Sequence, residues 1–219
     1  MIPPKENAAF VAAMEHVLAV YQRPRDPKRP LVCLDEAAKQ LVSATRLPVP
    51  MAPGRTARHD YEYRRGGTAS IFMAFAPLEG ARHVKVTAHR GKTDYAHFLA
   101  EISDTHFANA EKIVLVQDNL NTHTPASLYA TFTPEQARRI ADRFEWVYTP
   151  KHGSWLNMAE AELSVLSRQC LKERIGTQNA LTADVKAWAK HRNERNVIAN
   201  WQFKNEDARV KLRKLYPSV

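Results

Sequence analysis

Two apolar segments of the sequence each run directly into an aspartate. IVLVQDNLNTHTP (113–125) places Asp118 after a run of β-formers, and LVCLD (31–35) ends on Asp35. Short runs of this kind are typical of buried strands. Two carboxylates that lie close together repel each other and are costly to bury unless a cation lies between them. If the two strands are neighbours, the sequence therefore predicts a cation site at their ends.

A divalent ion of the Mg²⁺ type suits such a site, because Mg²⁺ prefers oxygen ligands and leaves positions for water and phosphate. The alternative interpretation of Asp118 is an aspartate that caps a turn, since Asp-Asn favours turns. A third acid is expected from a long helix over 156–175, which Gly176 closes. Glu160 and Glu162 each lie roughly 80° from the centre of its apolar face, on opposite edges, so periodicity does not choose between them.

The remaining elements follow from periodicity and from turn residues. The strand at 31–35 is predicted to end at its carboxylate, and residues 46–67 to form an irregular basic loop. Thr93 is the expected N-cap of the helix that starts at Asp94. Around these we predict helices at 5–21, 94–107, 133–144 and 181–196 and strands at 68–77, 81–89, 113–117 and 145–149.

The order of these elements predicts an α/β fold with a five-stranded mixed sheet flanked by helices. A crossover through a helix makes strand 113–117 parallel to strand 31–35, and the 68–89 hairpin extends the sheet at one edge. This is the order of ribonuclease H-like (retroviral integrase-like) domains. A phosphoryl-accepting receiver-like domain also has aspartates at strand ends, but the antiparallel hairpin argues against it.

Composition narrows the classes of partner. A net charge of +9 and a pI near 9.7 favour a polyanionic partner, most simply nucleic acid. No apolar run approaches the roughly 20 residues of a membrane helix, and the N-terminus does not have the pattern of a secretory signal. Cys33 and Cys170 have no metal or disulfide spacing, which favours free thiols in a reducing cytoplasm.

Four segments together resemble one family: LDEAAKQL, VLVQDNLNTH, YTPKHGSWLNMAEAELSVLSRQCL and NWQFKNEDARVKLRKLYP. They are similar to the DDE transposases of bacterial insertion sequences related to mariner elements (insertion-sequence family 630), from about residue 31 to the C-terminus. The resemblance implies that Glu160 is the third acid and that Asp35, Asp118 and Glu160 hold two Mg²⁺ or Mn²⁺ ions. It also implies cleavage at transposon ends and strand transfer of the 3′-hydroxyl into target DNA. Glu162 is then an edge residue of its helix, solvated or salt-bridged.

Further residues are expected to support this chemistry or to contact DNA. His123 could orient a ligand, touch a phosphate or cap a helix, and Asn157 could contact substrate or cap its helix. Glu36 should point to the opposite face of its strand from Asp35 and is not expected to be a ligand. The residues expected to contact DNA are Asn119, His123, Lys151, His152, Asn157, Arg55, Arg58, Arg64 and Arg65.

The sequence also predicts how the chain is organised. We expect an N-terminal helix and Pro-rich linker (1–30), a DDE catalytic domain (31–176) and a C-terminal helix with a basic tail packed on it (177–219). Members of the family usually carry an N-terminal helix-turn-helix region, and the residues before the first strand are too few for one. The resemblance implies double-stranded DNA as the partner, in bacterial cytoplasm at the nucleoid. We expect poor selection of terminal repeats unless a separate helix-turn-helix chain recognises them. Helix 5–21 could dock on that chain or on a second copy, or pack on its own core.

Two other functions share these features. A stand-alone ribonuclease H-like nuclease would use the same metal chemistry without strand transfer. A catalytically inactive, transposon-derived DNA-binding protein would keep the basic surface without the reaction.

Overall fold

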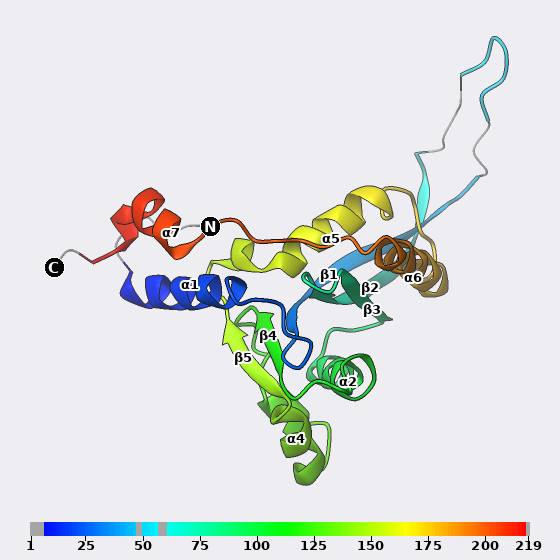
Figure 1. Cartoon of the computed structure of the whole chain (residues 1–219). Coiled ribbons are helices and arrows are strands. Elements are labelled where there is room, and N and C mark those ends of the chain that lie inside the picture. The colour runs from blue at the N-terminus through cyan, green and yellow to red at the C-terminus, as the bar shows by residue number, and fades with distance from the viewer. Residues whose placement is uncertain (1–6, 47–49, 57–60, 218–219) are drawn as a thin grey trace.

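Five strands form one mixed sheet in the order β3-β2-β1-β4-β5. In the computed structural model, residues 7–46, 50–56 and 61–217 are described. The sheet lies between two layers of helices (Figure 1). In chain order the strands are β1 (Leu31–Ala44), β2 (Tyr63–Ala76), β3 (Ala81–Thr87), β4 (Ile113–Gln117) and β5 (Phe144–Tyr148).

Strand pairing confirms the predicted topology. β1 is parallel to β4, with Cys33 opposite Val116, and β4 is parallel to β5. β2 and β3 form an antiparallel hairpin, and β2 also pairs antiparallel to β1. Helical crossovers precede β4 and β5, and such crossovers return the chain parallel to its earlier strand. The sheet is therefore the ribonuclease H-like arrangement that the element order predicts.

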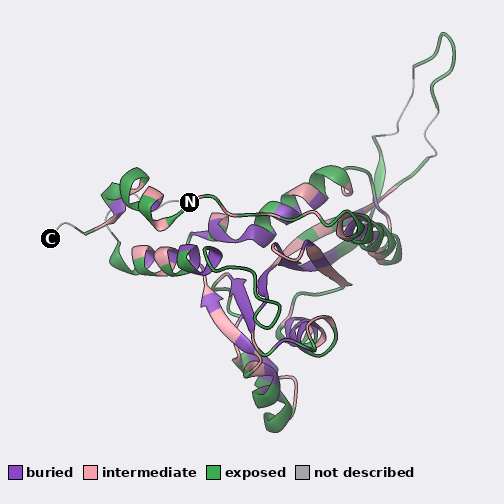
Figure 2. Ribbon diagram, viewed as in Figure 1, coloured by how far each residue is buried: buried purple, intermediate pink, exposed green. Residues whose placement is uncertain are grey.

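The two faces of the sheet are covered by different helices because side chains alternate along β1. Leu31 and Cys33 face a core shared with α1, α5 and α6, and Val32 and Leu34 face one shared with α2, α3 and α4. The buried residues in Figure 2 follow these two layers. The helices are α1 (Ala8–Tyr21), α2 (Lys92–Glu101), α3 (Ala126–Tyr129), α4 (Pro134–Ala141), α5 (Met158–Gln169), α6 (Gln178–Glu194) and α7 (Asn205–Lys211), with short turns η1 (Ile102–His106), η2 (Ser154–Leu156) and η3 (Arg213–Leu215).

The prediction that β1 ends at Asp35 is wrong. The strand continues to Ala44, and β2 begins at Tyr63, inside the segment predicted to be a loop. Apart from a bulge between Gln40 and Val42, the two strands pair throughout this extension. Residues with weak strand propensity are held there by the partner strand, which satisfies their backbone groups. The result is a long two-stranded arm that projects from the body (Figure 1).

Two helix boundaries also differ from prediction. α2 is capped at Gly91, whose N–H donates to the Asp94 carboxylate at 2.9 Å, so Thr93 lies inside the first turn. α5 ends at Gln169 and does not reach Gly176. The chain after it turns along β1, where the Leu171 carbonyl accepts from Lys39 Nζ at 2.6 Å and the Ile175 carbonyl from the Val42 N–H at 2.8 Å. These tertiary hydrogen bonds compete with further helical turns.

The N-terminal helix packs on the body of the protein. Phe10, Met14 and Val17 of α1 belong to the same core as α5 and α6. The segments around α1 and η3 contact each other beside it: the Asn7 N–H donates to the Leu215 carbonyl at 3.0 Å, and Glu15 pairs with Arg209 at 2.9 Å. Within the described ranges, no helix has both the length and the apolar character needed to cross a membrane.

Candidate active site

β1 and β4 bring the first two acids side by side. The parallel register pairs Cys33 with Val116, and two residues further along each chain lie Asp35 and Asp118. Neighbouring strands are about 4.8 Å apart, so the two carboxylates emerge together at one edge of the sheet. Both residues are partly buried. The structure thus places the predicted pair where a shared cation could contact both.

The charge balance at this edge favours a cation. Burial raises the pKa of Asp35 to about 7, and the nearby carboxylates of Glu36 and Asp118 add to the effect. An ion of opposite charge would reverse both causes, because it compensates for lost solvation and for carboxylate repulsion. The donor set at the edge, carboxylate oxygen, is the one that Mg²⁺ and Mn²⁺ prefer.

Asp118 is held by the loop that follows it. His123 Nδ1 donates to Asp118 Oδ1 at 2.6 Å, and the Leu120 N–H donates to the same oxygen at 3.1 Å. Burial by itself would raise the pKa of Asp118, but the hydrogen bonds and the charge of His123 leave this pKa below its ordinary value. His123 Nε2 lies 3.0 Å from Glu36 Oε2. Burial lowers the pKa of His123, and its two acidic neighbours outweigh that effect and raise it to about 9.

The start of α5 is tied to the strand that carries Asp35. The Asn157 amide donates to the Leu34 carbonyl at 2.8 Å, and its Oδ1 accepts from the Ala159 N–H at 3.1 Å as the helix N-cap. Glu160 follows in the first turn and is exposed. It therefore projects from the end of the helix that is fixed beside Asp35.

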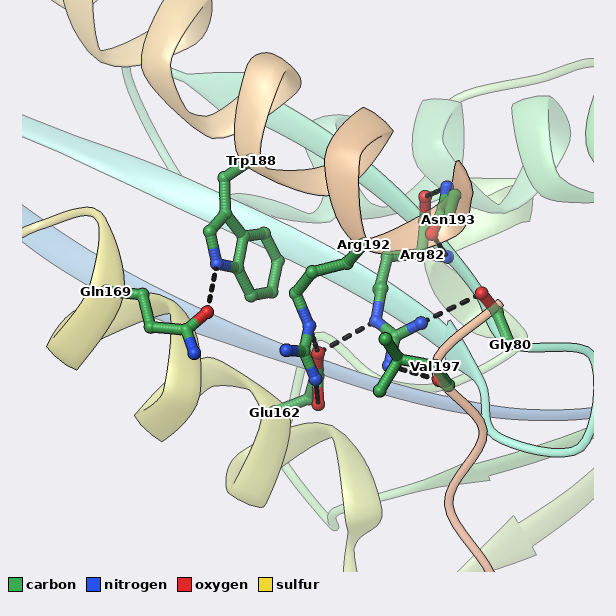
Figure 3. Close-up of polar contacts among 8 residues, drawn as sticks. All are labelled: Gly80, Arg82, Glu162, Gln169, Trp188, Arg192, Asn193 and Val197. Atoms are coloured by element: carbon green, nitrogen blue, oxygen red, sulfur yellow. Dashed lines mark hydrogen bonds and ion pairs between the residues drawn. The ribbon is translucent and has the colours of Figure 1, made fainter. Parts of the chain in front are cut away.

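Glu162 has a different role. It is buried between two arginines, Arg82 of β3 and Arg192 of α6, and its Oε1 lies 2.7 Å from Nε of each (Figure 3). The Arg82 side chain also donates to the Gly80 and Val197 carbonyls at 2.8 and 2.6 Å. Of the two outcomes expected for this residue, the structure shows the salt-bridged one. Its carboxylate oxygens contact the two arginines, whereas Glu160, the other acid of α5, is exposed.

The pairing of Glu162 also depends on a glycine at the turn between β2 and β3. Gly80 has φ +62°, which L side chains rarely adopt, and a Cβ there would lie 2.4 Å from Asn196 Oδ1. Any side chain at this position would therefore displace the turn whose carbonyl accepts from Arg82.

The three acids do not yet form a closed metal cage. Among the described residues, no group of three histidine, cysteine or acidic side chains is arranged as a metal site. Asp35 and Asp118 are brought together, whereas Glu160 stands in solvent on the first turn of α5. The residues fit a divalent cation in ligand chemistry, with two carboxylates already adjacent and an exposed one on a neighbouring fixed helix.

Two of the residues expected to contact DNA are buried instead. His123 is 0% exposed and contacts acids of the site, and Asn157 is 1% exposed and caps α5. Neither presents its side chain to the surface. For Asn157 the capping interpretation applies, and the His123 side chain contacts Asp118 and Glu36.

Other residues of this set lie on the surface around Asp118. Lys151 and His152 are exposed on the turn between β5 and α5, and Asn119 is exposed with its amide donating to the Thr149 carbonyl. An open pocket of about 590 Å³ adjoins this loop, and Asn119, Asn121, Tyr148 and Lys151 line it together with residues of α1. The pocket places amide and ammonium groups next to the acidic edge.

The arginines of the arm are also at the surface. Arg64 and Arg65 are exposed at the start of β2, and Arg55 is exposed in the loop before it. Arg65 donates to the Tyr63 hydroxyl at 3.4 Å. Arg58 lies outside the described residues. The arm therefore carries positive charge away from the body of the protein.

The contact between Glu36 and His123 was not among the expected features of the site. Glu36 does point away from the α5 face, as expected, but it reaches His123 and through it Asp118. The signals were present as an acid beside Asp35 and a histidine five residues after Asp118. Their meeting across 87 residues could not be read from either segment alone.

Comparison with known proteins identifies the family. The sequence matches the family described as "DDE superfamily endonuclease" over residues 30–182, which is more than half of the chain. A comparison with curated protein sequences found no match.

Solved structures support the same assignment of fold. The chain is similar to the Mos1 mariner paired-end complex with Mn, at 14% identity and a TM-score of 0.56, covering 90% of this chain and 61% of that one. It is also similar to the Mos1 strand transfer complex, at 14% identity and a TM-score of 0.60, covering 90% of this chain and 60% of that one. A Mos1 paired-end complex with Mg matches at 13% identity and a TM-score of 0.60, covering 100% of this chain and 66% of that one. The chain thus spans about three fifths to two thirds of the Mos1 chains.

Proposed function

Because this chain belongs to the DDE superfamily endonucleases, we propose that it is the catalytic domain of a DNA transposase. It would cleave DNA at transposon ends and transfer the 3′-hydroxyl into target DNA by in-line phosphoryl transfer. The observation that carries the proposal is that Asp35 and Asp118 each lie two residues beyond the parallel pair Cys33–Val116, beside a helix whose first turn presents Glu160. The Mos1 structures of similar fold are DNA complexes, two of them with Mn or Mg.

Asp35, Asp118 and Glu160 are the residues that would hold two Mg²⁺ or Mn²⁺ ions. When bound, such a pair activates the attacking hydroxyl and stabilises the leaving oxygen of the displacement. Asp35 lies within β1, and Asp118 directly follows β4 and is held by hydrogen bonds from Leu120 and His123, which limits the movement of both. Glu160 is held less tightly and would turn toward the edge as the third ligand.

The exposed cations around the edge would bind the DNA backbone. Lys151 and His152 lie on the turn beside the site, and Arg55, Arg64 and Arg65 extend along the arm. Contacts with phosphates position a duplex without reading its sequence. Affinity should therefore fall steeply as salt rises, since neutralised phosphates release counterions.

The experiment offers the protein a supercoiled plasmid and a short duplex with a recessed, labelled 3′-hydroxyl, in Mg²⁺ or Mn²⁺. We expect nicking and joining of the duplex to the plasmid, both abolished by chelation. Asp35→Asn, Asp118→Asn and Glu160→Gln should each lower the rate about 100-fold or more, because lost metal ligation is worth several kcal/mol in the transition state. Asp184→Asn, at an exposed position on α6, is the matched control.

Each competing function has its own outcome in this experiment. Metal-dependent nicking without any joined product would identify a stand-alone nuclease. DNA binding without nicking, unchanged in the Asp118→Asn variant, would identify an inactive DNA-binding protein. Full activity in Glu160→Gln would remove that residue from the site.

A further inference from the structure

Three side chains, Glu36, His123 and Asp118, contact one another in this order beside the candidate site. His123 lies between Asp118 and Glu36, with its Nδ1 2.6 Å from Asp118 Oδ1 and its Nε2 3.0 Å from Glu36 Oε2. The side chains of His123 and Glu36 are 1% and 4% exposed, whereas that of Asp118 is 36% exposed. This row of contacts therefore begins at the buried Glu36 and ends at the accessible carboxylate of Asp118.

The position of His123 is fixed from two sides. Its ring stacks on that of Tyr95, with centroids 4.8 Å apart and planes 28° from parallel. The Tyr95 hydroxyl donates to Gln117 Oε1 at 2.6 Å, and Gln117 Nε2 donates to the His123 carbonyl at 2.9 Å. Both the ring and the backbone of His123 are therefore held by residues of α2 and β4, which leaves its Nδ1 one direction in which to donate.

This arrangement orients the Asp118 carboxylate. Both hydrogen bonds that reach it from described residues, from His123 and from the Leu120 N–H, end on Oδ1. The carboxylate is thereby fixed in rotation, and Oδ2 is the oxygen presented to a ligand. Metal-binding carboxylates commonly have one oxygen held in this way by an outer hydrogen bond.

Glu36 has no other evident reason to be buried. It lies on the face of β1 that packs against α2, among apolar residues, where an unpaired carboxylate would cost several kcal/mol. The imidazole of His123 faces this carboxylate, with Nε2 3.0 Å from Oε2. Asp35 and Glu36 are adjacent in sequence and therefore point to opposite faces of the strand. Asp35 reaches the site directly, and Glu36 reaches it through His123.

We propose that His123 and Glu36 are positioning residues that hold Asp118 in its metal-binding orientation. The proposal rests on the proposed function, because it assigns to Asp118 the role of a metal ligand. Loss of such outer hydrogen bonds typically lowers metal affinity about 10–100-fold. The two residues should accordingly change the affinity for the ion, and not the surface that binds DNA.

The test measures binding of Mn²⁺ alone to the purified chain, by calorimetry and by the loss of the free-ion paramagnetic resonance signal. His123→Gln places its amide nitrogen near the position of Nε2 and loses the bond to Asp118, whereas His123→Asn places it near Nδ1 and keeps that bond. We expect the dissociation constant to rise about 10–100-fold in His123→Gln, which loses the bond to Asp118. Glu36→Gln and His123→Asn keep that bond and alter only the contact between residues 36 and 123, so each should raise the constant by less than about 10-fold. His191→Gln, exposed on α6, is the matched control. The Mg²⁺ concentration for half-maximal nicking should shift in the same order.

The outcomes separate this proposal from the proposed function. Absence of Mn²⁺ binding by the parent chain, or binding unchanged in Asp118→Asn, would refute the metal site itself. Binding that Asp118→Asn abolishes and that His123→Gln and Glu36→Gln leave unchanged would refute only the positioning role. Should His123→Gln not fold, Glu36→Gln gives the same measurement. Failure of both variants to fold would overturn the proposal, because His123 and Glu36 would then be needed for folding itself.

Discussion

Replacing Glu162 by glutamine tests the distinction between the two acids of α5. Glu162 is the single anion between Arg82 and Arg192, whose side chains are 0% and 15% exposed. Its Oε1 accepts from both Nε atoms at 2.7 Å, and Oε2 accepts from Arg192 at 3.3 Å. These contacts join α5 to β3 and α6. Glutamine preserves the shape but leaves two buried guanidinium groups without a counter-charge.

The expected loss is large because neither arginine can return to solvent without opening the interface. Breaking a buried ion pair by removing one partner costs about 3–5 kcal/mol. In a chain of this size each kcal/mol lowers the melting temperature by about 2–4 °C, so Glu162→Gln should melt roughly 6–20 °C below the parent. Glu160→Gln is the matched control, two residues away on the same helix and exposed, and should change the free energy of unfolding by no more than about 0.5 kcal/mol.

The assay combines urea denaturation, scanning calorimetry and the nicking reaction on the same three proteins. We expect opposite results for the two variants. Glu162→Gln should lose stability and retain activity below its melting temperature, whereas Glu160→Gln should retain stability and lose activity. A Glu162→Gln protein as stable as the parent would refute the structural role of the ion pair. A stable Glu162→Gln protein with no Mn²⁺ binding would instead make Glu162 the third ligand.

Three further results are expected. Burial, with the charge of His106 in addition, lowers the pKa of His83 from 6.5 to about 4. Between these pH values the unfolded protein binds a proton that the folded protein does not, so the free energy of unfolding should fall by up to about 3 kcal/mol as pH drops from 6.5 to 4. A His83→Gln variant should show a shallower decline in the same denaturation series. Burial raises the pKa of the Cys33 thiol to about 12. A thiol reagent at pH 8 should therefore modify one cysteine, Cys170, in the native protein and both cysteines in urea. Rapid modification of both in the native state would contradict the buried position of Cys33. Asn157→Ala should lower the free energy of unfolding by about 1–3 kcal/mol because it removes a helix cap and the donor to Leu34. Asn157→Ser, which can keep the cap without the donor to Leu34, should fall between it and the parent in urea midpoint.

Much of the fold could be predicted from the sequence because its signals are local. Apolar runs located β4 and β5, and helical spacing located α1, α4 and α6, since these elements bury one face or both against a single core. The helical crossover before β4 then determined its direction relative to β1. From this topology alone Asp35 and Asp118 could be placed together, because each directly follows an apolar run on one of two parallel neighbouring strands.

The boundaries that prediction missed depend on partners distant in sequence. β1 beyond Asp35 has weak strand propensity, and its pairing with β2 extends it to Ala44. α5 stops at Gln169 because the following carbonyls bond to Lys39 and Val42 of β1. Local propensity is a weak prior wherever tertiary hydrogen bonds can satisfy the backbone in another way.

The sequence by itself determined which residue types stand at the site, and the tertiary structure decided which of them work together. Periodicity left Glu160 and Glu162 equivalent, and the structure separates them because Arg82 and Arg192, 80 and 30 residues from Glu162, converge on one acid. Glu36 meets His123 only because β1 and the loop after β4 fold against each other. Long-range charge pairing leaves no trace in local spacing, and it is this pairing that distinguishes an acid held inside the protein from one exposed on the same helix.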